Sequence, residues 1–247
     1  MNEGWHAVWN RRRIADDRAL LLDDLIALNG FDTGSMAIRA SEWRSNARRI
    51  AGVLGIRPGD KVYEIGCGCG AFLLALQECV DCEVAGADYS GGLIDVARKV
   101  FPGHAFDVMS AVDMETSEPC DHAISHSMFH YLNLYEASTV IGKMLAKASR
   151  TVGIFDLPDL ATRDRAEAMR RGNMPEGEYD KKYEGLAHTY YDKAWLHAQV
   201  QQSCAGASVE FIGSQIDNNP QSPFRFGMII RKNTSAASLA TEKQGQR

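Results

Sequence analysis

The sequence has no long apolar run, since none approaches the roughly 20 residues that a helix needs to cross a bilayer. Residues 1–6 also lack the charged and then apolar design of a secretory signal. With 45% hydrophobic and 24% charged residues, the composition is that of a soluble globular protein. We therefore expect a cytoplasmic protein with no membrane contact, whose 247 residues form one core of ordinary size.

Concentrated positive charge is also missing. The formal net charge is −5, and the only compact arginine clusters lie at 11–13 and 48–49. A nucleic-acid groove needs a basic face, whereas short scattered clusters are typical of solvated helix surfaces. We therefore expect no nucleic-acid partner.

The six cysteines are poorly arranged for a metal site. One residue separates Cys67 from Cys69, and two residues separate Cys79 from Cys82. Only the second pair has the gap of a zinc knuckle. That pair falls at the end of a predicted helix, where no helix N-terminus would activate a redox thiol. Small side chains in tight places explain these cysteines better than a metal or a disulfide does.

The most informative feature that is present is a glycine-rich turn. Gly66, Gly68 and Gly70 follow a short apolar run that carries Glu64, and a helical pattern begins directly afterwards at 71–78. Glycine lacks a Cβ, so the backbone can turn sharply and let a ligand lie against it. A strand, a turn of this kind and a helix form the layout of a nucleotide-type site.

A second signal is an acid at the end of the next apolar run. Residues 83–87 are followed by Asp88, which lies eighteen positions after Gly70. An acid at this spacing can accept hydrogen bonds from both hydroxyls of a ribose. The alternative role is a surface helix cap, because Ser90 and Gly91 come next. The glycine turn and the acid together indicate a cofactor that contains adenosine.

Two cofactors fit these signals. Residues 66–71 also meet the loose Gly-x-Gly-x-x-Ala pattern of dinucleotide sites. However, Glu64 would repel a pyrophosphate, whereas S-adenosylmethionine has no phosphate and carries an ammonium and a sulfonium. A dehydrogenase would also need Tyr-x-x-x-Lys, and the nearest match, Tyr179 and Lys182, has the wrong spacing. We favour S-adenosyl-L-methionine; an NAD-dependent oxidoreductase and a non-catalytic partner protein with the cofactor fold are the alternatives.

These motifs resemble those of the class I S-adenosylmethionine-dependent methyltransferases. The matching residues are Glu64-x-Gly66-x-Gly68-x-Gly70, Asp88-Tyr89-Ser90 with Leu93, and residues 121–125. The resemblance covers about residues 40–232. It implies methyl transfer to an oxygen or nitrogen of a small-molecule metabolite, such as an intermediate of secondary metabolism, with a homodimer left open. One fold hosts many acceptors, so the resemblance does not name the acceptor.

The order of patterns predicts an α/β fold with a seven-stranded, mostly parallel Rossmann-like sheet and helices on both faces. We expect strands at 61–65, 83–87, 104–109, 122–126, 150–155, 209–216 and 224–231, and helices at 71–78, 93–100, 135–148 and 192–204. A helical N-terminal cap at 1–50, with helices near 20–28 and 42–54, would precede the cofactor-binding domain at 51–232. A lid-like insertion at 157–191 and a disordered tail at 233–247 complete the expected organisation. Trp5, Trp9 and Trp43 are expected to be packing residues rather than ligand platforms.

The cofactor site is expected where the carboxyl ends of the parallel strands meet. The candidates are Glu64, Gly66, Cys67, Gly68, Gly70, Asp88, Tyr89, Ser90, Leu93, Ser110, Ala111, His126 and Ser127. Tyr89 and Leu93 are placed to flank the adenine. The resembled family often has an acid at the place of Ser110, which contacts the adenine amino group. Serine departs from that pattern, and the backbone amide of Ala111 remains to bind the adenine ring.

Histidines near two of these strand ends are candidates for a general base. Methyl transfer mainly requires alignment, and a base is needed only if the acceptor holds its proton. Histidine titrates near neutrality and suits that work. We expect His126 to touch the cofactor and His188, on the insertion, to face the acceptor, while His130 is either a base or part of a hidden helix face.

Asp156 is the third catalytic candidate, because it follows the strand predicted at 150–155. Its alternative role is to cap the turn at Pro158. Metal-assisted transfer would need further acids and an asparagine at these strand ends, and Asp156 with Asp159 does not make that set. We therefore expect no metal.

Overall fold

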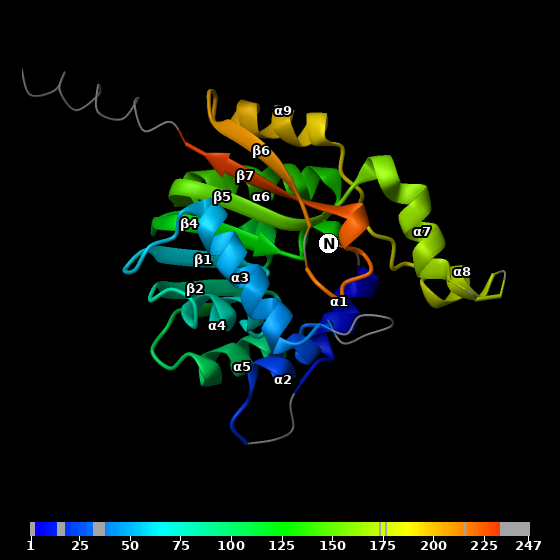
Figure 1. Cartoon of the computed structure of the whole chain (residues 1–247), viewed down its shortest axis with the longest axis horizontal. Coiled ribbons are helices and arrows are strands. Elements are labelled where there is room, and N and C mark those ends of the chain that lie inside the picture. The colour runs from blue at the N-terminus through cyan, green and yellow to red at the C-terminus, as the bar shows by residue number, and fades with distance from the viewer. Residues whose placement is uncertain are drawn as a thin grey trace, which may run out of the picture.

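A computed structural model describes residues 3–13, 18–31, 38–172, 174–175, 177–214 and 216–232. At its centre lies a seven-stranded sheet with the order β3-β2-β1-β4-β5-β7-β6 (Figure 1). The strands are β1 (Lys61–Ile65), β2 (Glu83–Asp88), β3 (Phe106–Val108), β4 (Cys120–His126), β5 (Ala148–Pro158), β6 (Ser208–Gly213) and β7 (Arg225–Arg231). Strands β1 to β5 pair in parallel, and β7 runs antiparallel to both β5 and β6. The predicted fold class is confirmed.

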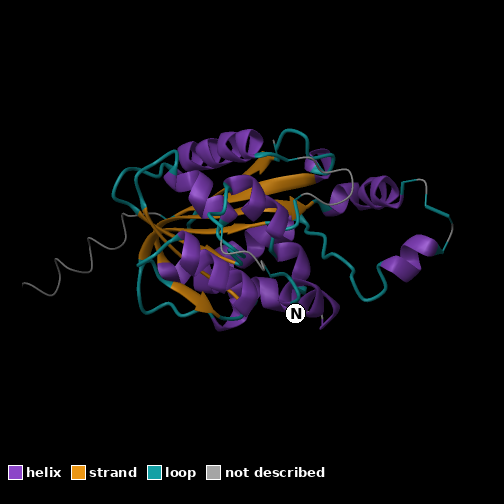
Figure 2. Ribbon diagram, turned by 90° about the horizontal axis from the view of Figure 1, so that it is seen from below, coloured by secondary structure: helices purple, strands orange, loops and turns teal. Residues whose placement is uncertain are grey.

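Helices cover both faces of the sheet (Figure 2). The described helices are α1 (Glu3–Asn10), α2 (Leu22–Leu28), α3 (Ala40–Leu54), α4 (Ala71–Gln77), α5 (Gly91–Val100), α6 (Leu134–Lys147), α7 (Arg163–Arg171), α8 (Glu178–Lys182) and α9 (Lys193–Ser203). Helices α2 to α5 share one apolar cluster with one face of the sheet, and α6 and α9 share a second cluster with the other. Since central parallel strands are buried on both faces, the four residues of β1 after the exposed Lys61 are all buried, and Glu64 is the charged residue among them.

The helix starts follow local capping chemistry. Asn133 accepts the backbone N–H of Glu136 at 2.9 Å, and the Glu136 carboxylate accepts the N–H of Asn133 at 2.9 Å, which is a capping box for α6. Asp192 accepts the N–H of Trp195 at 2.8 Å and so caps the start of α9. These caps fix the residues at which α6 and α9 begin, on the sheet face that both helices cover.

Strand β5 is longer than predicted. It continues past 155 to Pro158, because Leu157 and Pro158 pair with Phe226 and Arg225 of β7 across a register shift. The prediction that Asp156 follows the strand is therefore wrong: Asp156 lies within β5, at the irregularity, with φ +63°. The lid-like insertion begins correspondingly later. Strands β3 and β6 are shorter than predicted.

The insertion carries α7 and α8, which extend outward from the sheet on the right of Figure 1. Its returning segment is anchored beside the short 3-10 turn η2 (Phe129–Tyr131): the N–H of Thr189 donates to the carbonyl of His130 at 2.9 Å, and the Tyr191 hydroxyl donates to the carbonyl of Phe129 at 2.7 Å. The tail predicted at 233–247 lies outside the described residues. In the described part of the chain, none of the helices combines the length and apolar character of a membrane span.

Candidate active site

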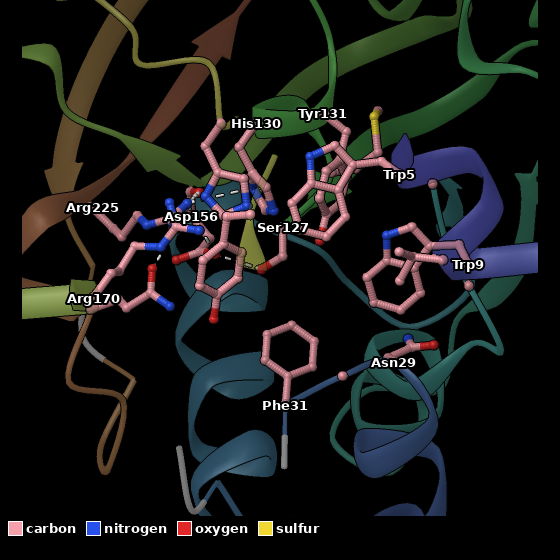
Figure 3. Close-up of a pocket in the computed structure, with 18 of the residues that line it drawn as sticks. Trp5, Trp9, Asn29, Phe31, Ser127, His130, Tyr131, Asp156, Arg170 and Arg225 are labelled. Atoms are coloured by element: carbon pink, nitrogen blue, oxygen red, sulfur yellow. Dashed lines mark hydrogen bonds and ion pairs between the residues drawn. The ribbon is translucent and has the colours of Figure 1, made fainter. Parts of the chain in front are cut away.

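A cavity of about 950 Å³ opens at the carboxyl edge of the sheet (Figure 3). It lies beyond β1 and β4, next to the point where the strand order reverses, which is where ligands bind in open α/β sheets. The predicted site residues that line it are Gly66, Gly68, Asp88, Tyr89, Leu93, His126, Ser127, His130, Asp156 and His188. Candidates from both the cofactor and the acceptor set thus meet in one space.

Six of the predicted cofactor residues do not line this cavity. They are Glu64, Cys67, Gly70, Ser90, Ser110 and Ala111. Two of them, Gly70 and Cys67, instead close the glycine turn. The N–H of Gly70 donates to the carbonyl of Cys67 at 2.9 Å. Ser110 and Ala111 begin a separate 3-10 turn after β3, so the structure does not bring them to the described lining.

The glycine turn packs against Asn29, the residue that follows α2. Gly66 and Gly68 have φ +73° and +55°, a region that other residues rarely adopt. A Cβ at Gly66 would collide with Met128, and one at Gly68 would collide with the Asn29 side chain. The side-chain oxygen of Asn29, Oδ1, also accepts the N–H of Cys69 at 3.0 Å. Sequence reasoning missed Asn29 as a site residue. Its only local signal is its position directly after the last residue of α2.

Asp88 connects the glycine turn to the start of α5. Its carboxylate accepts the N–H of Gly68 at 3.0 Å and the N–H of Ser90 at 2.8 Å. Burial raises the pKa of Asp88, and the bonds from Ser90 and Gly68 partly offset that rise. Each oxygen accepts one of these bonds and has capacity for another. Asp88 therefore organises the turn and can still accept hydroxyl groups from the cavity.

The cysteine pairs are free thiols in tight surroundings. The Cys67 thiol contacts the carbonyl of Gly68 at 3.6 Å, and the Cys69 thiol contacts the carbonyl of Leu25 at 3.3 Å. Burial raises the pKa of both thiols. Among the residues that the structure describes, no cluster of three or more His, Cys, Asp or Glu side chains is arranged to hold a metal ion.

Glu64 is a buried carboxyl group with an unsatisfied oxygen. Its side chain is 2% exposed, and Oε2 has no hydrogen-bond partner. Burial, followed by the nearby charge of Asp88, raises the pKa of Glu64 well above its usual 4.5. A positively charged group bound nearby would favour the ionised form instead.

We expect Glu64→Gln to stabilise the ligand-free protein increasingly as the pH rises. The folded-state pKa of Glu64 is raised, so above the unfolded value of 4.5 the folded state holds a proton that the unfolded state has lost. The free energy of unfolding therefore falls with rising pH, and glutamine removes that fall. For a domain of this size, each kcal/mol added to the free energy of unfolding raises the Tm by about 2–4 °C.

Melting curves between pH 4.5 and pH 8, run in parallel on Glu83→Gln, check this expectation. Glu83 begins β2 and is solvent-exposed, with its side chain 68% accessible, so its variant controls for general loss of a negative charge. A difference in Tm that stays constant across the pH range would contradict a raised pKa at Glu64.

Two strained residues face each other, one directly after β4 and one at the irregularity within β5. Ser127 has φ +56° and Asp156 has φ +63°. Non-glycine residues in this region cost about 1–3 kcal/mol each and concentrate at functional sites. The Ser127 hydroxyl donates to Asp156 Oδ2 at 2.8 Å, whereas Asp156 Oδ1 is buried without a partner. The strained backbone thus holds one carboxylate oxygen and leaves the other available.

A chain of hydrogen bonds positions Ser127 from behind. Arg49 donates to Asn46 Oδ1 at 2.9 Å, which orients the Asn46 amide so that Nδ2 donates to His126 Nε2 at 3.1 Å. Burial lowers the pKa of His126 to about 4, so the ring is neutral and its proton is on Nδ1, 3.0 Å from the Ser127 hydroxyl. Sequence reasoning missed Asn46 and Arg49, because both come from α3, far away in the chain.

Aromatic and histidine rings form one wall of the cavity. The ring of Trp5 stacks on His188 with centroids 5.2 Å apart and lies 4.8 Å from Tyr131. Trp9 also lines the cavity, whereas Trp43 is 1% exposed and packs in the core. The expected packing role holds for Trp43, while Trp5 and Trp9 pack and also line the cavity, where α1 places both rings (Figure 3).

The two candidate catalytic histidines share this wall. Their ring centroids lie 4.5 Å apart. Burial lowers the pKa of His130 and of His188 well below the usual 6.5, so both rings are neutral at physiological pH. Arg225 donates to His130 Nδ1 at 3.4 Å, while both nitrogens of His188 are inaccessible to solvent and have no hydrogen-bond partner. His188 therefore has unused hydrogen-bonding capacity.

Comparison with known proteins finds a match for the central part of the chain. Residues 62–150 match the family described as methyltransferase domain. The demethylmenaquinone methyltransferase of Symbiobacterium thermophilum is 34% identical over 80 residues, which is 32% of this chain and 32% of that protein. The chain therefore aligns with about a third of the length of this curated relative.

Solved structures match nearly the whole chain. The magnesium protoporphyrin IX methyltransferase of Synechocystis with bound S-adenosylmethionine gives a TM-score of 0.56 at 14% identity, over 94% of this chain and 93% of that chain. The N-methyltransferase NodS from Bradyrhizobium japonicum gives a TM-score of 0.54 at 14% identity, over 78% and 95%. At these identities the likeness establishes the fold.

Proposed function

We propose that this chain, whose residues 62–150 match a methyltransferase domain and whose fold is that of solved methyltransferases, transfers a methyl group from S-adenosylmethionine to an oxygen or nitrogen of a small molecule. The observation that supports this most is the cavity: it joins a glycine turn and Asp88 to the free carboxylate oxygen of Asp156.

The residues of the cofactor half fit S-adenosylmethionine. The backbone at Gly66 and Gly68 would hold the methionine part, Asp88 the ribose hydroxyls, and Tyr89 with Leu93 the adenine. The unpartnered Oε2 of Glu64 suits a ligand that carries positive charge rather than a pyrophosphate. When bound, the cofactor supplies a methyl group already activated by a sulfonium.

Asp156 is our candidate for the group that takes the acceptor's proton. Ser127 donates to Oδ2 and fixes the carboxylate, so Oδ1 is left to accept a hydrogen bond from an acceptor hydroxyl or amine. Such a bond orients the nucleophile, and the carboxylate receives its proton as the new bond to carbon forms. His126 and Asn46 act as positioning residues for Ser127.

His188 and His130 have different roles in this proposal. A strongly lowered pKa makes a neutral histidine a weak base, so we assign proton uptake to Asp156 and hydrogen bonding to the acceptor to His188. His130 is already engaged by Arg225 and would support the wall. The assignment of His188 to the acceptor side rests on its unpartnered nitrogens.

Thermal melting with three ligands tests the proposed function. We expect S-adenosylmethionine and S-adenosylhomocysteine to raise the Tm by about 5–10 °C at a hundredfold excess over the dissociation constant, because binding to the folded state adds about 2.7 kcal/mol. NADH should give no shift. A shift with NADH alone would overturn the proposal and favour an oxidoreductase.

A further inference from the structure

The cavity is positively charged although the chain as a whole is acidic. Among the described residues that line it, the cations are Arg12, Arg170, Arg171, Lys182 and Arg225, and the carboxylates are Asp88 and Asp156. The formal net charge of the whole chain is −5, so composition does not explain this bias. S-adenosylmethionine adds a net positive charge of its own, and a second ligand would therefore meet positive surroundings.

Two of these arginines are largely buried at the end of the cavity that holds Asp156. The Arg225 side chain is 6% exposed and the Arg170 side chain is 12% exposed. They come from β7 and α7 and lie together on one side of the cavity in Figure 3, opposite Trp9. The nearest carboxylate oxygen to Arg225 is Asp156 Oδ2 at 3.8 Å, which is too long for a hydrogen bond.

Both arginines act on the histidines of the cavity wall. Arg170 also pairs with Glu167 at 3.2 Å. After burial, the charges of Arg170 and Arg225 contribute to the lowered pKa of His188. The same two arginines contribute to the lowered pKa of His130.

The wall beside these arginines is built from flat rings. Trp5, Tyr131 and His188 lie within 4.8–5.8 Å of one another by ring centroid, and Trp9 lies 5.8 Å from Tyr131. Offset and edge-to-face contacts with a bound ring are favourable on such a surface. The wall thus suits a planar ligand.

Resting on the methyl transfer proposed above, we propose that the acceptor is an aromatic carboxylate. Its ring lies against the wall of Trp5 and Tyr131, and its carboxylate binds at Arg170 and Arg225. Planar guanidinium groups match a carboxylate in shape and charge. A neutral aromatic compound would add no counter-charge to these two guanidinium groups, and an aliphatic acid would leave the ring wall without a partner.

Three small probes separate the two parts of this proposal. Salicylate carries a ring and a carboxylate, phenol carries the ring alone, and lactate carries the carboxylate alone. Titration calorimetry is performed on the full chain saturated with S-adenosylhomocysteine, after binding of that ligand has been measured separately. We expect salicylate to bind at least about tenfold more tightly than phenol or lactate, and to lose affinity as salt is added.

Variants assign the effect to the named side chains. Arg170→Gln should weaken salicylate binding about tenfold and leave phenol binding unchanged, whereas Trp5→Leu should weaken both salicylate and phenol and leave lactate unchanged. Arg163→Gln is the matched control, because Arg163 begins the same helix but does not line the cavity. Its affinities should equal those of the unaltered protein.

The outcomes distinguish this proposal from the proposed function. If S-adenosylhomocysteine binds but salicylate and phenol bind equally, the aromatic carboxylate is wrong and methyl transfer still stands. If Arg170→Gln weakens phenol as much as salicylate, the arginine does not recognise the carboxylate and the proposal is also wrong. Failure of S-adenosylhomocysteine to bind would instead overturn the proposed function.

Discussion

Replacing Asp156 by asparagine is expected to slow methyl transfer by about 10²–10⁴-fold, the usual contribution of a positioned acid or base. Asparagine tolerates the left-handed backbone that Asp156 adopts, and its oxygen can still accept the hydrogen bond from Ser127. It cannot take up a proton. The melting temperature of the ligand-free protein and the affinity for S-adenosylhomocysteine should therefore stay close to those of the unaltered protein.

The measurement is the initial rate of tritium transfer from methyl-labelled S-adenosylmethionine into a mixed small-molecule extract or a purified acceptor, with cofactor affinity determined in parallel. Asp159→Asn is the matched control, since Asp159 lies three residues along, pairs with Lys193 at 2.6 Å and does not line the cavity. A full rate in the Asp156 variant would show that this carboxylate does not receive the acceptor's proton.

The cofactor half of the site was predictable because its determinants are local. A strand, three alternating glycines and a helix follow one another within a few residues. Asp88 is the last residue of β2, which pairs directly with β1. Neighbouring parallel strands bring their carboxyl ends together wherever else the chain goes. Gly66, Gly68 and Asp88 accordingly line the cavity. Ser110 and Ala111 do not line it; they follow the short β3, at the start of the 3-10 turn Ala111–Asp113.

The acceptor half depends on segments that meet only in the folded chain. Arg225 contacts His130 across 95 residues, and the Trp5 indole donates to the carbonyl of Ala187 across 182 residues. No local sequence pattern predicts contacts between residues so far apart in the chain. The position of Asp156 within β5 has the same origin, since β5 is extended by pairing with β7. Sequence reasoning therefore identified Asp156 and His188 as chemically able groups but not the arginines and tryptophans around them.

Replacing Asp88 by alanine is expected to reduce the affinity for S-adenosylhomocysteine by about 10²–10³-fold, because hydrogen bonds to a charged group contribute about 1.5–3 kcal/mol each. The loss has two physical sources. The variant lacks the acceptor for the ribose hydroxyls, and it frees the N–H groups of Gly68 and Ser90 that the carboxylate holds in the folded turn. The ligand-induced rise in Tm should therefore vanish at concentrations that saturate the unaltered protein.

Two further variants separate these sources. Asp88→Asn keeps one acceptor oxygen and should retain more affinity than alanine, while Asp107→Ala removes an exposed acid from the neighbouring strand β3 and should change nothing. Melting of the ligand-free proteins shows whether the turn itself is weakened. If Asp88→Ala keeps the full S-adenosylhomocysteine shift, the ribose is held elsewhere, because this carboxylate is the described acid that lines the cofactor half of the cavity. In that event the glycine turn would have to bind the cofactor through its backbone alone.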